Sequence, residues 1–429
     1  MNTEKLDVVE SDERTADAPV HEDRTDLLGE LCTQRPLEYL NRLRATDPVH
    51  WNARHRSWIV TSYQAVGEGL RNPKLLSNRI RMLRERIPSD KQDTVGKTLG
   101  LLEQWMVFQD NPDHRRLKGV VHKAFTPQTV AKHESDIRTL AREQVDRLTR
   151  ELEDGADKPI DILNDVAYEI PGPIICRMLG VPQEDRPQFI TWTEEMSSVV
   201  SGFGVDSDPY EATHAAVTSL VDYLNDLMDR MGSGEDNLIS QLLDAEKEGE
   251  RLTREEVIGT ATLLLFGGNR TTSGMMANGI RALLLHPDQL TLLNDDPGLL
   301  DNALAEILRW EAHTKVTVRV AGEDFEWFGK RIRKGDRVFL SPLAANHDPS
   351  VFDEPGRFDI TRANANRNIA FGTGIHLCLG MPLAQLELKV FFQEILATLP
   401  RLRLVAPEGN WMPSFVSRVQ RELMVSAKG

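Results

Sequence analysis

The feature that most constrains this chain is a glycine-broken loop around one cysteine near the C-terminus. The loop reads Phe371-Gly-Thr-Gly-Ile-His-Leu-Cys-Leu-Gly380, and a run of helix-forming residues, 381–389, follows it directly. Glycine permits backbone conformations and close approaches that a side chain would block. The backbone N–H groups at the start of a helix favour a thiolate over a thiol. The sequence therefore predicts a thiolate at Cys378, presented at the start of a helix with a flat approach to the sulfur.

Cys378 on its own admits three roles. A lone cysteine is most often a buried structural residue, because free cysteine is among the most buried residue types. A nucleophile and a metal ligand are the other two roles, and the cysteine alone does not decide among them.

The spacing around Cys378 favours the metal ligand. The pattern Phe371-x-x-Gly374-x-x-x-Cys378-x-Gly380 resembles the haem-binding loop of the cytochrome P-450 family at each position. The resemblance implies haem b with Cys378 as the iron ligand, and a thiolate below haem iron favours O–O cleavage. The loop residues that it assigns to cofactor binding are Phe371, Gly372, Gly374, His376, Cys378 and Gly380, with His376 near a haem propionate.

Composition excludes several other classes of function. The chain has 51 Lys and Arg against 66 Asp and Glu, a net charge of −15, which argues against nucleic acid and against an anionic membrane surface. Its three cysteines, Cys32, Cys176 and Cys378, make no disulfide framework, which favours a reducing cytoplasm. No apolar run approaches the roughly 18 residues of a membrane span, and the acidic N-terminus is unlike a secretory signal. We therefore expect a cytoplasmic protein without a membrane anchor.

The resemblance extends from about Leu27 to the C-terminus. It implies a mainly α fold with small β-sheets, the cytochrome P-450 fold, as a single triangular haem domain over 27–429. Residues 1–26 are acidic and lack apolar periodicity, which predicts a disordered tail. The patterning predicts helices over 36–44, 130–153 and 161–170, strands over 57–62 and 316–321, and a strand, turn and strand over 325–340. The resemblance also places 75–106 over the substrate pocket, 182–205 in a mobile lid and 412–417 in contact with substrate.

A second motif lies in the segment 110–127, which reads as a turn followed by a helix. His114 and Lys118 are four residues apart and share one helix face, which by itself describes a basic surface helix. The resemblance assigns this pair to a haem propionate. Lys118 stands where the family usually has Arg, and a lysine cannot fork around a carboxylate. Arg115, Arg116 and Lys123 would add a basic patch that suits an acidic electron-transfer partner.

A third motif lies inside a long helix that Thr253 opens with a capping box and that ends near Leu285. Gly267 and Gly268 interrupt its centre, where each costs about 1 kcal/mol relative to alanine. The hydroxyl of Thr271 can bond the carbonyl of Gly267 and bend the helix. This segment resembles the family's oxygen-binding groove, so Gly267, Gly268, Arg270 and Thr271 are predicted catalytic-site residues.

Arg270 departs from the family pattern, because Asp or Glu usually stands there and helps carry protons toward bound oxygen. Arginine does not titrate near neutral pH and offers only donors. Three interpretations follow: Arg270 turns outward to a carboxylate and water carries the protons, it anchors an anionic substrate group, or the enzyme uses peroxide or radical coupling instead.

Three further arginines match positions of the family. Glu306 and Arg309, three residues apart on a helix, resemble its structural Glu–Arg pair, with Arg362 as the third member. Arg319 matches an arginine that binds a propionate through charge-assisted bonds. Two positions depart from the pattern, namely His347, where Arg is common, and Asn368, where His often stands.

These observations predict a haem-thiolate monooxygenase that inserts one oxygen atom from O₂ into a small organic substrate of the secondary-metabolite or xenobiotic and terpenoid type. No flavin domain is visible, so the expected partner is an acidic ferredoxin or flavodoxin with a separate NAD(P)H reductase. The alternative, prompted by Arg270, is a haem-thiolate oxidase that couples C–C or C–N bonds or uses peroxide. A haem protein that only binds a ligand or gas is the non-catalytic alternative.

Overall fold

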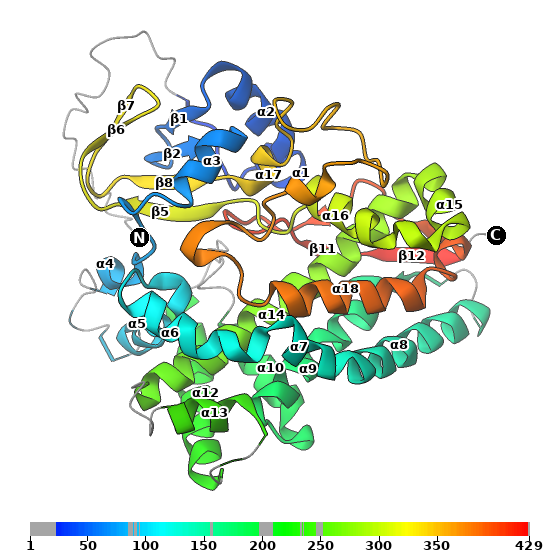
Figure 1. The fold of residues 1–429 in the computed structure, drawn as a ribbon, viewed down its shortest axis with the longest axis horizontal. Coiled ribbons are helices and arrows are strands. Elements are labelled where there is room, and N and C mark those ends of the chain that lie inside the picture. Colours follow the sequence, from blue (N-terminus) through cyan, green and yellow to red (C-terminus); the bar gives the residue numbers. More distant parts are fainter. Residues whose placement is uncertain are drawn as a thin grey trace, which may run out of the picture.

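The computed structural model describes residues 23–84, 89, 92–93, 95–154, 158–196, 209–231, 234, 236–245 and 252–427. Most helices gather on one side of the molecule, and the largest sheet lies on the other side (Figure 1). One long helix, α14 (Arg254–Leu285), runs through the middle of the helical part. The prediction of a mainly α fold with small β-sheets is therefore confirmed.

Most helices pack their apolar faces into one large core together with α14, while two smaller cores lie around the main sheet. In chain order the other helices are α1 (Glu30–Gln34), α2 (Pro36–Thr46), α3 (Tyr63–Gly69), α4 (Ile80–Arg84), α5 (Val95–Glu103), α6 (Asp113–Val121), α7 (Pro127–Val130), α8 (Glu134–Asp154), α9 (Pro171–Leu179), α10 (Arg186–Glu195), α12 (Pro209–Arg230), α13 (Leu238–Ala245), α15 (Pro287–Asp295), α16 (Leu300–Trp310), α17 (Pro342–Ala345) and α18 (Met381–Ile395).

The main sheet has five strands in the order β1-β2-β8-β5-β3, and the contact between β2 and β8 is its parallel one. A three-stranded sheet has the order β4-β12-β9, and two hairpins pair β6 with β7 and β10 with β11. The strands are β1 (Val49–Asn52), β2 (Ser57–Val60), β3 (Leu75–Leu76), β4 (Ile160–Asp161), β5 (Thr317–Ala321), β6 (Phe325–Trp327), β7 (Lys330–Ile332), β8 (Arg337–Leu340), β9 (Leu402–Leu404), β10 (Asn410–Trp411), β11 (Gln420–Glu422) and β12 (Met424–Ala427).

Helix α14 begins as the sequence predicts. The hydroxyl of Thr253 accepts a hydrogen bond from the backbone of Glu256, and the Glu256 carboxylate accepts one from the backbone of Thr253. The helix is buried along most of its length, so its neighbours must approach closely. Gly268 makes this possible on one side, because a Cβ there would lie 2.9 Å from the side chain of Ile175 on α9. Helix α14 also packs against α18, which follows the cysteine loop.

Three predicted elements were wrong in detail. The segment 161–170 is not an ordinary α-helix: Asp161 ends strand β4, a π-helical turn covers Ile162–Val166, and a 3₁₀ turn covers Ala167–Glu169. The region 325–340 holds three strands rather than two, because the chain also turns at Phe328, where φ is +49°. The predicted helix over 130–153 begins at Glu134, after short turns.

The prediction of a disordered tail over 1–26 can be compared with the structure only from residue 23 onward. Residues 1–22 of the expected tail lie outside the described part of the chain. Asp23 and Asp26 already make specific contacts: Asp23 accepts a hydrogen bond of 2.5 Å from Tyr39, and Asp26 accepts one of 3.0 Å from the backbone of Leu28. Of the segment 182–205, which is predicted to form a lid, residues 182–196 are described and include α10, whereas 197–205 lie outside the described residues.

Candidate haem-thiolate site

The cysteine loop takes its shape from two glycines and one backbone hydrogen bond. Gly372 and Gly374 have φ values of +73° and +78°, which other residues adopt only with strain. The N–H of Cys378 donates to the carbonyl of Phe371 over 3.0 Å and closes the loop. Gly380 has φ −78° and does not need this freedom, although nothing lies within 4 Å of where its Cβ would be. The loop thus delivers Cys378 to the start of α18.

The pKa of the Cys378 thiol is subject to opposing effects, of which the sequence indicates only those that lower it. Burial raises the pKa of the thiol, while hydrogen bonds from the backbone of Gly380 and Met381 and the charge of Lys118 lower it. Burial dominates, so the pKa of the free thiol lies above its ordinary value. The helix N-terminus alone therefore does not make the thiolate, and a bound metal cation would complete the stabilisation.

The surroundings of Cys378 suit a ligand. The side chain is accessible to solvent, although protein atoms surround it densely enough for burial to dominate its pKa. Both observations describe a side chain that lines a recess rather than the outer surface. Cys32 and Cys176 are fully buried by comparison, and burial raises their pKa values to about 11 and about 12. They are structural, as the sequence predicts for both.

A cluster of basic groups lies beside the loop. The rings of His114 on α6 and His376 in the loop are 4.1 Å apart between centroids. Burial lowers the pKa of His114 to about 4 and that of His376 to about 2, and the charge of Lys118 adds to both shifts. Arg319 on β5 lies close enough that its charge also lowers both histidine pKa values. The structure thus brings together the predicted propionate ligands His114, Arg319 and His376.

Arg79 belongs to this cluster, although the resemblance places its segment, 75–106, over the substrate pocket and gives this residue no part in cofactor binding. Arg79 and Arg319 both donate to the carbonyl of Val318, over 3.2 and 3.0 Å. Burial lowers the pKa of each guanidinium to about 10, and the charge of Arg319 adds to the shift at Arg79. The arrangement depends on how distant segments meet, so no local signal in the sequence reveals it.

The cluster needs negative charge, because its cations repel one another in a buried place. Among its described electrostatic partners Asp110 supplies a carboxylate that raises the pKa values of His114 and Arg319. Buried cations are stable when paired with hydrogen-bonded anions. The two propionates of a haem would supply such anions, and charge-assisted bonds from Arg319 and Arg79 would hold them.

Lys118 has a different partner from the one expected. Its ammonium group donates to the carbonyls of Ile375 and Leu377, over 2.6 and 2.9 Å. Both carbonyls belong to the cysteine loop. Lys118 therefore ties α6 to the loop and places a positive charge near Cys378.

The centre of α14 contains the predicted hydrogen bond between Thr271 and Gly267. The hydroxyl of Thr271 donates to the carbonyl of Gly267 over 2.5 Å. Gly267 is exposed, with nothing within 4 Å of where its Cβ would be, whereas Gly268 faces Ile175. The two glycines thus have different roles: Gly267 opens space beside α14, and Gly268 allows α9 to approach.

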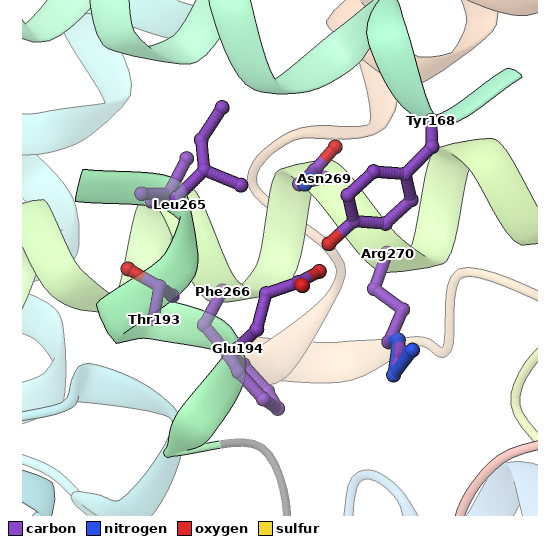
Figure 2. Close-up of a pocket in the computed structure, with 8 residues that line it drawn as sticks. Tyr168, Thr193, Glu194, Leu265, Phe266, Asn269 and Arg270 are labelled. Atoms are coloured by element: carbon purple, nitrogen blue, oxygen red, sulfur yellow. The ribbon is translucent and has the colours of Figure 1, made fainter. Parts of the chain in front are cut away.

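Arg270 lies beside a carboxylate of another helix. It lines a small cavity with Glu194 of α10, and Figure 2 shows both side chains at this cavity. Burial raises the pKa of Glu194, and the positive charge of Arg270 opposes this shift. This placement agrees with the first of the three interpretations of Arg270, a partnership with a carboxylate.

The predicted Glu–Arg lock forms as expected. Glu306 and Arg309 are fully buried and joined by two hydrogen bonds of 2.7 Å, and Arg362 donates to Glu306 over 3.2 Å. Arg309 also donates to the carbonyls of Asn346, Pro355 and Arg357. The network fixes the segment that leads to the cysteine loop.

The two departures from the pattern have structural roles. Asn368 donates to the carbonyls of Ala305 and Ala365, over 3.3 and 2.9 Å. His347 is buried, and its Nδ1 lies 3.0 Å from the carbonyl of Leu343.

This donor set fits a haem whose iron is bound by one thiolate and whose propionates are bound by a cationic cluster. The comparisons with known proteins agree. The family model described as Cytochrome P450 matches residues 81–294 and 297–405. A biotin biosynthesis cytochrome P450 of Bacillus subtilis is 32% identical over 396 residues, 92% of this chain and 96% of that protein. Vitamin D(3) 25-hydroxylase of Pseudonocardia autotrophica is 37% identical over 384 residues, 88% of this chain and 90% of that protein.

Solved structures show the same fold. The crystal structure of P450BioI in complex with an acyl carrier protein ligated to hexadec-9Z-enoic acid has a TM-score of 0.81 and 30% identity, and the match covers 93% of this chain and 99% of that one. The structure of CalO2 has a TM-score of 0.84 and 28% identity over 94% of this chain and 98% of its own.

The chain belongs to the cytochrome P450 family. It is a haem b monooxygenase, an oxidoreductase that incorporates oxygen from O₂. Among the described helices none is both long and apolar enough to cross a membrane.

Proposed function

We propose that the chain hydroxylates a small organic substrate of the secondary-metabolite or terpenoid type, with Cys378 as the axial iron ligand and 27–429 as one haem domain. The observation that carries the proposal is the accessible Cys378 thiol, set in a recess beside a cluster of two guanidinium groups, Arg79 and Arg319, and two neutral histidines, His114 and His376. Relatives support the substrate class: one is a vitamin D(3) 25-hydroxylase, one a steroid C26-monooxygenase and one the monooxygenase PikC.

The haem supplies the oxygen chemistry when bound, and the protein's residues hold and direct it. Cys378 would bind the iron, and Arg79 and Arg319 would orient the propionates. Gly267 leaves room for O₂ and substrate beside α14. The hydroxyl of Thr271 lies beside Gly267, whose carbonyl it contacts, and from there it could pass protons. The peroxide or coupling alternative is prompted by Arg270, and the placement of Arg270 and Glu194 at one cavity supports the monooxygenase proposal instead.

The first experiment is a carbon monoxide spectrum of the reduced protein. We expect a Soret band at the position that thiolate ligation gives, and we expect Cys378→Ala to lose it. A Cys378→Ala protein that keeps the band would refute the ligand assignment. A compound library read by the low-spin to high-spin shift of the haem absorption then identifies the substrate. Product formation with NAD(P)H, a surrogate ferredoxin system and O₂ excludes a protein that only binds ligand.

Electrons come, in this proposal, from an acidic ferredoxin or flavodoxin with a separate reductase. The predicted patch of Arg115, Arg116 and Lys123 needs a correction, because Arg116 donates both of its terminal NH groups to Glu256. Arg115 is exposed on α6, and the loop beside it exposes Ile375 and Leu377. A face that combines cations with a few apolar side chains suits an acidic protein partner.

Arg115→Glu tests the partner surface. We expect the apparent Michaelis constant for the ferredoxin to rise about tenfold at low salt, and less at high salt, because steering by exposed charges is screened. Arg331→Glu, an exposed arginine on β7, is the matched control and should leave the constant unchanged. Equal constants for the two variants would reject the docking face. The cytoplasm remains the proposed location, since all three cysteines are free.

A further inference from the structure

A small cavity with a mostly apolar surface lies between α10, the 3₁₀ turn Ala167–Glu169 and α14 (Figure 2). Five of the residues that line it carry polar groups, namely Tyr168, Thr193, Glu194, Asn269 and Arg270. Figure 2 shows the hydroxyl of Tyr168 and the carboxylate of Glu194 pointing toward the same space. The cavity borders the segment of α14 that also carries Thr271.

Two oxygen atoms at this cavity lack partners. Oε1 of Glu194 and Oδ1 of Asn269 are buried, and neither has a hydrogen bond within the described part of the chain. Asn269 as a whole is only 4% exposed. An unpaired buried acceptor costs about 1–3 kcal/mol, so native structures usually satisfy such atoms with protein or ordered water.

The cavity is large enough to supply the missing partner. It offers about 20 Å³, and a water molecule needs about 10–15 Å³ together with two to four polar neighbours. Glu194, Asn269, Tyr168 and Arg270 provide those neighbours. No direct ion pair between Glu194 and Arg270 occurs among the described contacts, yet the charge of Arg270 acts on Glu194. A bridging molecule between them accounts for both facts.

The charges around Glu194 keep its carboxyl group able to exchange a proton. Burial favours the neutral acid and raises its pKa, while Arg270 favours the carboxylate. Tyr168, Thr193 and Asn269 face it as neutral groups, and Glu195 next to it is exposed. Arg270 also acts on His313, a buried residue whose Nδ1 has no described partner and whose pKa burial lowers to about 4. His313 therefore stays neutral near neutral pH, whereas burial raises the pKa of Glu194 above its ordinary value.

We propose that one water molecule in this cavity joins Glu194 to Arg270, and that Glu194 is the carboxyl group through which protons reach the Thr271 side of α14. This inference rests on the proposed monooxygenase function. Arg270 acts as the fixed counter-charge and holds the water by donating to it. Glu194 on α10 thereby supplies the proton-carrying carboxyl group that the family usually has at position 270.

The proton balance is simple. Insertion of one oxygen atom consumes O₂, two electrons from the protein partner and two protons, and releases one water molecule. For each proton, neutral Glu194 gives its hydrogen to the cavity water while that same water gives up one of its own toward Thr271, so the water is left unchanged and Glu194 becomes a carboxylate. Bulk water then reprotonates Glu194, so the residue returns to its starting state.

Infrared spectroscopy of the ferric holoprotein tests the charge coupling without turnover. The C=O stretch of the protonated Glu194 carboxyl is assigned by its loss in Glu194→Gln, and its midpoint is followed by pH titration. We expect Arg270→Gln to raise that midpoint by about one pH unit, because a nearby opposite charge shifts a carboxyl by about this amount or more. An unchanged midpoint in Arg270→Gln, or no titrating band that Glu194→Gln removes, would overturn the inference.

Coupling of electron uptake to product tests the proton path. We expect Glu194→Gln to lower the ratio of product to NAD(P)H consumed about tenfold, since a positioned proton donor commonly supplies a hundredfold or more. Glu195→Gln, one residue along and exposed, is the matched control and should keep the wild-type ratio. The carbon monoxide spectrum and substrate-induced spin shift should stay normal in both variants.

Failure of the inference about Glu194 can be distinguished from failure of the proposed monooxygenase function. If Glu194→Gln and Glu195→Gln couple equally well in an otherwise active enzyme, the inference is wrong and the proposed function stands. If the wild type forms no product and no thiolate-type spectrum, the proposed function fails and the inference falls with it.

Discussion

The ammonium group of Lys118 donates a hydrogen bond of 2.6 Å to the carbonyl of Ile375, three residues before Cys378. A second bond of 2.9 Å reaches the carbonyl of Leu377. One side chain of α6 thus fixes two carbonyls that flank His376. An arginine at this position would spread its donors over a wider fork, whereas the compact lysine head fits between two neighbouring carbonyls.

Lys118→Met should loosen the cysteine loop. Bonds from a charged donor contribute about 1.5–3 kcal/mol each when buried, and Lys118 is partly exposed, so we expect a total loss of about 1–2 kcal/mol. Urea unfolding of the holoprotein, followed at the Soret band, measures it. Lys118→Arg should give an intermediate value. Lys132→Met, an exposed lysine before α8, is the control, and a Lys118→Met protein as stable as this control would contradict the prediction.

Glu306→Ala should prevent normal folding around the haem. The change leaves Arg309, which is fully buried, without its carboxylate, and a buried charge stripped of its partner costs about 3–5 kcal/mol. The yield of haem-loaded protein and its urea midpoint are the measurements. Asp301→Ala on the same helix breaks an exposed pair with Lys389 and should cost less than about 1 kcal/mol. Similar losses in the two variants would refute the assigned role of the buried pair.

Gly267→Ala and Gly268→Ala should change stability in opposite directions. A methyl group at Gly268 would lie 2.9 Å from Ile175, so overpacking should destabilise the protein by about 1–3 kcal/mol. At Gly267 nothing lies within 4 Å, and the gain in helix propensity should stabilise it by up to about 1 kcal/mol. The same methyl would enter the open space beside α14, so Gly267→Ala should weaken the substrate-induced spin shift. Equal stability changes would show that the two positions do not differ as described.

Local patterns in the sequence predict the elements that local forces determine. The capping box at Thr253, the bond from Thr271 to Gly267 and the pair of Glu306 with Arg309 all join residues three or four positions apart, and the structure confirms each. The π-helical turn after Asp161 could not be predicted in this way, because Asp161 pairs with Met424 in a strand. The extra turn at Phe328 was missed because a large residue with positive φ gives no signal.

The site residues that the sequence did not reveal depend on contacts between distant segments. Arg79 reaches the carbonyl of Val318, 239 positions away, to join the cationic cluster. Glu194 lies in the segment that the resemblance places in a lid, and it becomes a candidate site residue only because Arg270 on another helix lies near it. Glu387 on α18 is similar: it is fully buried, and burial raises its pKa well above the ordinary value, opposed by a hydrogen bond with Thr272. Such groups become visible only when the helices are placed beside one another.

His347 should make the stability of the fold sensitive to acid. Burial lowers its pKa to about 3, with further lowering by the charges of Arg309, Arg44 and Arg362, so the folded protein keeps it neutral. In the unfolded chain, where water surrounds the imidazole, a histidine titrates at about pH 6.5. Below that pH the unfolded chain binds a proton that the folded protein does not, so stability falls as the pH falls toward 3.

Between about pH 6.5 and about pH 5 this residue alone should cost about 2 kcal/mol, at about 1.4 kcal/mol per pH unit. Urea midpoints at the two pH values measure the loss, and His347→Gln should show a smaller difference than the wild type because glutamine does not titrate. His122→Gln removes an exposed histidine and should retain the wild-type sensitivity. If His347→Gln loses as much stability on acidification as His122→Gln, the buried imidazole is not the source. Burial and the charges of Arg309 and Arg362 keep the folded imidazole neutral, so a confirmed effect would show that acid acts by protonating this histidine in the unfolded chain.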